Sequence, residues 1–173
     1  IGAVIGAYIG GSTANNDFNP VNWDYQSGKT WGYMIGGAAI GGVSGWAGGA
    51  VAAGIGQNLT FAGGGLIGAG AGGAVGGAIS GGGFAALAGR DIGEGIWKGA
   101  VSGLAGGLVG GYIGGGWGAF AGGATSGGVG VALKGGDAED IAKGALLGGA
   151  ISWGAYQTSQ GIAYHNYKKG GGN

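Results

Sequence analysis

The chain has 173 residues, of which 55 are glycine, about a third of the sequence where about 7% is usual. Charged residues make up 8%, the seven basic and seven acidic residues cancel, and cysteine is absent. This composition excludes the basic footprint of a nucleic-acid-binding protein, and it excludes a disulfide scaffold or a cysteine-based metal site.

The N-terminal part combines an apolar segment with the most polar stretch of the chain. Residues 1–10 are typical of the end of an apolar helix, and because the first residue is Ile1 rather than Met, we expect a fragment of a longer protein. Residues 11–28 are rich in Asn and Asp and contain the single proline, Pro20. Such side chains bond to nearby backbone in Asx turns, so the composition predicts a polar, Asx-rich loop over residues 11–28.

Two apolar segments follow this loop. Residues 29–57 and 62–89 are separated by a predicted turn at residues 58–60, and no charged residue occurs from position 30 to position 88. A helix of about 20 residues crosses the hydrocarbon core of a bilayer, so the uncharged run has room for two membrane-length helices.

Two further apolar segments with acidic starts make up the C-terminal part. Residues 92–133 and 138–165 are predicted to be helical, and residues 166–173 to be a flexible tail. Acidic side chains stabilise a helix N-terminus because they cap the first turn and complement the helix dipole. The predicted helix caps are Asp91, Glu94, Asp137 and Asp140.

Glycine spacing indicates that the apolar segments are helices. Glycine pairs four residues apart occur 24 times, where about 17 are expected at random, whereas pairs three residues apart occur 10 times. Residues i and i+4 share one face of an α-helix, whereas a polyproline II bundle needs glycine at every third position. A row of glycines lets two helix backbones approach closely. The predicted helix-packing residues are Gly37, Gly41, Gly45, Gly49, Gly64, Gly68, Gly72, Gly76, Gly99, Gly103, Gly107, Gly111 and Gly115.

We therefore predict one all-α domain over residues 1–173, with four or five helices in antiparallel glycine-zipper hairpins. A glycine-rich polyproline II bundle is the alternative fold. Aromatic residues such as Trp23, Trp31, Trp153 and Tyr164 cluster at the edges of the apolar segments. Interfacial belts at a membrane and aromatic plugs over a glycine-lined core explain these clusters equally well.

The motifs that suggest catalysis or cofactor binding are incomplete. Gly28-Lys29-Thr30 ends like a P-loop, but Trp23 stands where the first glycine of that loop is required. His165 is the single histidine, and the acidic residues are explained by helix caps and Asx turns. We therefore predict no enzyme activity, no cofactor and no metal site.

Two short motifs are distinctive against the Gly/Ala-rich background: NNDFNPVNWD at residues 15–24 and IWKGAVSG at residues 96–103. They resemble the region that follows the repeat-associated core of Rhs/YD-repeat polymorphic toxin proteins, especially those of Bacteroidetes, and the similarity covers most of the chain. The resemblance implies a place downstream of a β-cage in a protein exported for competition between bacteria. It implies no catalytic residue, because the toxin ends of this family vary and none of their active-site motifs occurs here.

These features together predict a non-enzymatic segment of an Rhs-like secreted toxin that inserts into a membrane and forms a pore or translocates cargo. The expected partners are a lipid bilayer or further copies of the chain in a homo-oligomer, together with the parent Rhs-like chain, and no nucleic acid. The expected location is secreted or at the cell surface, inserted in a target membrane. A soluble structural protein of filament, spike or ice-binding type is the alternative, which the low mean hydropathy of +0.31 favours.

Overall fold

The fold is an all-helical array. The computed structural model describes residues 1–58 and 64–169. In these residues the elements are α1 (Gly2–Asn15), the short 3-10 helix η1 (Pro20–Asn22), α2 (Gly28–Asn58), α3 (Gly64–Leu87), α4 (Ile92–Ile113), α5 (Gly115–Ala132) and α6 (Ala138–Lys169). The all-α prediction is confirmed for this part of the chain, and the polyproline II alternative is wrong for it.

The number of helices differs from the predicted four or five, because the described ranges contain six α-helices. Residues 92–133 form two helices, since Gly114 adopts φ +72° and Gly115 φ +59° and the chain reverses there. Residues with a side chain rarely adopt these angles, so glycine permits the break. A glycine inside a helix and a glycine that ends one look alike in a sequence this rich in glycine, which is why the break was missed.

Two predicted boundaries also need correction. The polar loop is shorter than residues 11–28, because α1 continues to Asn15 and α2 begins at Gly28. The side chains of Ser12 and Thr13 donate hydrogen bonds to carbonyl oxygens one turn earlier, which keeps them compatible with a helix. The predicted tail starts too early, since α6 runs to Lys169. Residues 59–63 and 170–173, including parts of the predicted turn and tail, lie outside the described residues.

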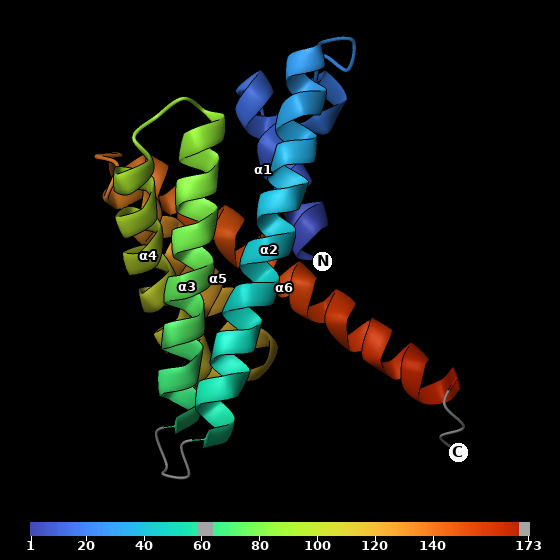
Figure 1. Cartoon of the computed structure of the whole chain (residues 1–173), viewed down its shortest axis with the longest axis vertical. Coiled ribbons are helices and arrows are strands. Elements are labelled where there is room, and N and C mark those ends of the chain that lie inside the picture. Colours follow the sequence, from blue (N-terminus) through green and yellow to red (C-terminus); the bar gives the residue numbers. More distant parts are fainter. Residues whose placement is uncertain (59–63, 170–173) are drawn as a thin grey trace.

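Each helix packs against its neighbours in sequence, and consecutive helices run antiparallel (Figure 1). The contacts at glycine positions establish the direction, because Gly2 and Gly6 of α1 lie opposite Gly41 and Gly37 of α2. The loop at 16–27 and the turns at 88–91 and 133–137 therefore lie at one end of the array. The break at Gly114 lies at the other end.

The C-terminal half of α6 projects away from the other helices (Figure 1). Residues 157–169 are all exposed to solvent. The first half of α6, by contrast, packs against α5.

Candidate membrane-facing surface and glycine interfaces

The helix interfaces are built from glycine in direct backbone contact. In the α3–α4 pair, a Cβ atom added to Gly77 would overlap the carbonyl oxygen of Gly99, and one added to Gly99 would overlap that of Gly77. Gly73 and Gly103 stand in the same reciprocal relation. Only glycine permits this approach, because any larger residue would push the two backbones apart.

Equivalent pairs occur at both ends of the chain. Gly6 and Gly37 meet reciprocally in the α1–α2 pair, and Gly123 and Gly148 meet reciprocally in the α5–α6 pair. The α4–α5 contact is less symmetric, since a Cβ on Gly118 would overlap the carbonyl oxygen of Gly110, whereas one on Gly110 would lie 3.0 Å from that of Gly118. Close backbone contact is thus the common mode of packing along the array.

Ten of the thirteen predicted packing glycines have an atom of a neighbouring helix within 4 Å of the position that a Cβ would occupy. These are Gly37, Gly41, Gly45, Gly68, Gly72, Gly76, Gly99, Gly103, Gly107 and Gly111. Gly64 is buried at the start of α3.

Two predicted packing positions lie elsewhere. Gly49 has no neighbour within 4 Å, because α1 begins opposite Gly41 and does not reach two turns further along α2. Gly115 is also open, since it belongs to the break that separates α4 from α5.

The inner helices carry a second glycine row that the sequence analysis missed. In α3, Gly68, Gly72 and Gly76 face α2, whereas Gly73, Gly77 and Gly81 face α4. The two rows are offset by one residue, which is about 100° around an α-helix. Adjacent glycines repeated every four residues, as at 72–73 and 76–77, were the available signal, because they place two glycine rows on one helix.

The offset of about 100° bends the array, because α3 and α5 each receive two neighbouring helices on adjoining faces rather than on opposite ones. On the inner side of the bend lies a shallow, open groove of about 350 Å³ that is lined only by glycine and serine. Ser44, Ser80, Ser126 and Ser152 contribute to its wall from α2, α3, α5 and α6. The hydroxyl of Ser80 donates to the carbonyl oxygen of Gly77, 3.1 Å away.

Large apolar side chains point outward. Trp46 of α2 is 76% exposed, Tyr112 of α4 is 83% exposed and Trp117 of α5 is 77% exposed, and the buried hydrophobic residues among those described are Trp23 and Ala85. The accessible surface is 9466 Å², whereas a compact chain of 16.1 kDa exposes about 7,400 Å². Glycine therefore lines the helix interfaces, and many aromatic and branched side chains lie on the outside.

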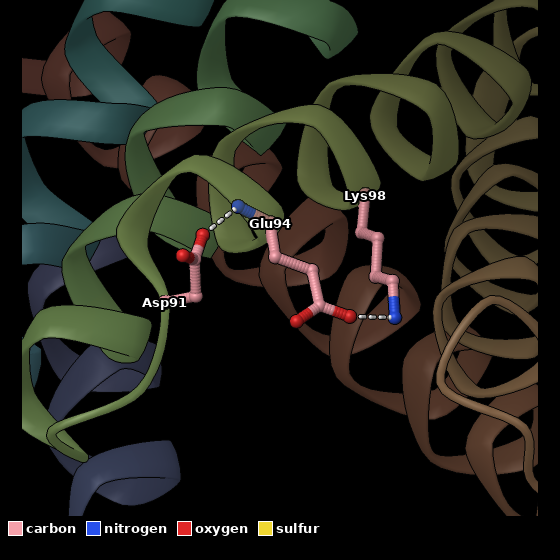
Figure 2. Close-up of polar contacts among 3 residues, drawn as sticks. All are labelled: Asp91, Glu94 and Lys98. Carbon is pink, nitrogen blue, oxygen red and sulfur yellow. Dashed lines mark hydrogen bonds and ion pairs between the residues drawn. The ribbon is translucent and has the colours of Figure 1, made fainter.

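Of the four predicted helix caps, Asp91 and Asp137 cap with their side chains, whereas Glu94 and Asp140 lie in the first turns of α4 and α6 and contribute backbone N–H groups. Asp91 is the N-cap of α4, where its carboxylate accepts a hydrogen bond from the backbone N–H of Glu94 at 2.6 Å. Figure 2 shows this bond together with the ion pair between Glu94 and Lys98. The start of α6 repeats the arrangement, since Asp137 accepts from the N–H of Asp140 at 2.9 Å.

The two capped turns bring basic groups together. The side chain of Lys134 is largely exposed, but its amine is partly desolvated, and this desolvation lowers the pKa of Lys134. The positive charges of Arg90 and Lys98 lower this pKa further. Lys134 follows α5, whereas Arg90 precedes α4. The pKa shift therefore reflects desolvation first, and the contribution of Arg90 is consistent with the two turns lying at one end of the array.

The polar loop is ordered by Asx turns and by one buried aromatic ring. Asp17 accepts from the N–H of Asn19 at 2.8 Å, and this bond, followed by one from Asn22, lowers the pKa of Asp17. The ring of Trp23 covers Gly11, and its Nε1 donates to the carbonyl oxygen of Asp17 at 2.7 Å. Trp23 is thus a plug over glycine, whereas Trp31 and Trp153 are about half exposed.

Within the described residues, no group of three or more His, Cys, Asp or Glu side chains could hold a metal ion. Of the described helices, α2 alone is long and apolar enough to cross a bilayer, with a mean hydropathy of 1.3 in its most apolar stretch. Two such helices were expected. In α3, eleven of the 24 residues are glycine, which lowers its mean hydropathy.

No family model matches the chain, and no solved structure matches it. A segment of 41 residues is 46% identical to part of salivary gland surface protein 1 of Aedes aegypti. The match covers 24% of this chain and 1% of that protein.

Proposed function

We propose that the chain is a non-enzymatic segment that inserts into a lipid bilayer, where its helices associate as glycine-zipper hairpins and form a pore or translocate cargo. The observation that supports this best is the inverted distribution of side chains, with glycine at the helix interfaces and Trp46, Tyr112 and Trp117 on the outside. Lipid provides no hydrophobic drive between helices, so close backbone packing is what holds them together there.

The energetics of the glycine-rich helices favour lipid over water. Each interior glycine costs about 1 kcal/mol relative to alanine, so the eleven glycines of α3 cost on the order of 10 kcal/mol in a water-exposed helix. In hydrocarbon, each unpaired backbone group costs several kcal/mol, so the helical state is maintained despite the glycines. The low mean hydropathy of these helices follows from the same glycines and is compatible with insertion.

The open glycine- and serine-lined groove would form the polar wall of a path through the inserted array. Ser44 and Ser80 donate their hydroxyl hydrogens to carbonyl oxygens of their own helices, so these polar groups have partners even where water is scarce.

We further propose that the segment belongs to an Rhs-like secreted toxin and acts outside the producing cell or at a cell surface. The two motifs at residues 15–24 and 96–103 support this proposal. The name of the Aedes aegypti protein also refers to a surface. Reading the coding sequence upstream of Ile1 tests the proposal: YD repeats are expected there, and an upstream region without them would contradict it.

The membrane proposal is tested by flotation with liposomes, combined with circular dichroism in buffer and in lipid. We expect the chain to float with the liposomes, to be strongly helical in lipid and to release an encapsulated dye. A chain that stays at the bottom of the gradient would contradict insertion. Filaments seen by negative-stain electron microscopy in buffer would instead favour the structural alternative.

A matched pair of variants tests the role of glycine packing in insertion. Gly103→Leu places a side chain against the backbone of Gly73, whereas Gly49→Leu places one in open space. We expect Gly103→Leu to reduce dye release strongly and Gly49→Leu to leave it near that of the parent chain. Equal release by both variants would contradict helix association through these glycines.

A further inference from the structure

Charged residues are segregated to one end of the array. Twelve of the fourteen charged residues lie in the loop at 16–27, in the turns at 88–91 and 133–137, or within seven residues of the helix starts that follow them. The antiparallel order of the helices brings these three connections to the same end (Figure 1). The positive charges of Arg90 and Lys98 contribute to lowering the pKa of Lys134, which agrees with this placement.

The opposite end of the array is aromatic, and the C-terminal end of α6 brings its only charged side chains among the described residues. Residues 99–133 contain no charge, and they form the second part of α4, the break at Gly114 and all of α5. At 1.5 Å per residue, the 18 residues of α5 are about 27 Å long, close to the thickness of the hydrocarbon core. Tyr112 and Trp117 flank the break and are strongly exposed, as expected of side chains at a membrane–water interface.

The two remaining charged residues, Lys168 and Lys169, lie at the end of the array that contains the α4–α5 break, because α6 runs toward that end. Trp153 and Tyr156 of α6 lie next to Gly116, at the level of the break between α4 and α5. Residues 157–169 continue beyond this level and end in Lys168 and Lys169. An array that enters a bilayer with this end first carries two charges across, whereas the reverse orientation carries twelve.

We infer that the array enters a bilayer with the α4–α5 break leading, that the loop and turns of the charged end stay on the side of entry, and that the C-terminal half of α6 emerges on the far side. This inference rests on the proposed function, to which it adds the topology of the inserted state. Charged side chains cost much free energy to move through hydrocarbon. The direction of insertion is therefore the one that moves two charged side chains across the bilayer rather than twelve.

The absence of cysteine makes the topology directly measurable. Val21 lies in the loop of the charged end and is 86% exposed, and Ser159 lies in the exposed half of α6. The variants Val21→Cys and Ser159→Cys are each added to preformed liposomes that retain an encapsulated dextran. After flotation, each is treated with a bulky polyethylene-glycol maleimide before and after the addition of detergent.

We expect Val21→Cys to react fully without detergent and Ser159→Cys to react only once detergent is added, with a several-fold rise in labelling. Full labelling of both variants on floated liposomes would overturn the inference while leaving membrane association intact. Protection of Val21→Cys with labelling of Ser159→Cys would also overturn it. Failure of both variants to float would instead contradict the proposed function itself.

Discussion

The α3–α4 pair and the C-terminal half of α6 are both regular helix, yet they differ in whether a neighbour packs against them. In the α3–α4 pair, glycine recurs every four residues and the two backbones touch at Gly73, Gly77 and Gly81. In the second half of α6, Gly154 and Gly161 are seven residues apart, and neither has an atom within 4 Å of its Cβ position. Helix formation and helix association are therefore specified separately in this chain, and the four-residue glycine row specifies the association.

Replacing a glycine in the tight row should have the largest effect. Gly77→Ala forces a methyl group against the carbonyl oxygen of Gly99, so α3 and α4 must separate. We expect the variant to lose about 3 kcal/mol of stability, as overpacking of a close interface does. Thermal unfolding followed by circular dichroism in detergent micelles measures the loss.

The matched control is Gly54→Ala in α2, where the added methyl group meets nothing within 4 Å. Alanine is the better helix former, so this variant should be more stable by about 0.5–1 kcal/mol. Equal stabilisation by the two substitutions would show that helix propensity, rather than backbone contact, dominates.

The contrast between these two regions also explains how much of the fold could be predicted. The helices and the contact rows at 68–76 and 99–107 follow from glycine at i and i+4, because that spacing encodes one face of a helix. The break at Gly114 could not be predicted, because the sequence does not distinguish a glycine with positive φ from a glycine inside a helix. The extension of α6 from residue 165 to Lys169 was missed because residues 166–169 are polar and carry no glycine row to mark a packed helix face.

For the candidate site, the sequence predicted rows of packing glycines but not how they bend the array. The groove depends on two rows offset by one residue, and on serines from four helices that are far apart in the sequence. Such an arrangement follows from which helix packs against which, so the spacing within one helix does not determine it.

Removing a helix cap should have the next largest effect. Asp91→Ala leaves the N–H of Glu94 without its carboxylate partner at the turn of the tight α3–α4 pair. We expect a loss of about 1 kcal/mol, measured by the same thermal unfolding. Asp91→Asn keeps an acceptor oxygen and should recover most of the lost stability. If Asp91→Asn is as unstable as Asp91→Ala, the capping role is contradicted.

The projecting half of α6 should respond to helix propensity alone. Gly161→Ala adds a methyl group in open space, so we expect this segment to become more stable as a helix by up to about 1 kcal/mol. Hydrogen exchange of the amides in residues 157–169 measures the change, and slower exchange there with unchanged exchange in α3 and α4 is expected. Faster exchange would indicate a contact that alanine disturbs.

The smallest expected effect concerns the basic groups at the charged end. The pKa of Lys134 is lowered by desolvation and by Arg90 and Lys98, so between the folded pKa and the ordinary value of 10.5 the unfolded chain binds more protons. The free energy of unfolding should therefore rise with pH through this alkaline range, and Lys134→Gln should remove that rise.

At neutral pH, Lys134→Gln should stabilise the fold by less than about 0.5 kcal/mol, because an exposed charge is screened by solvent. Lys169→Gln removes the same charge from the projecting end of α6 and is the control. If both variants keep the rise in stability with pH, the repulsion between the 88–91 and 133–137 turns is absent. The proximity of those two turns would then need another measurement, such as a disulfide cross-link between single cysteines placed in each.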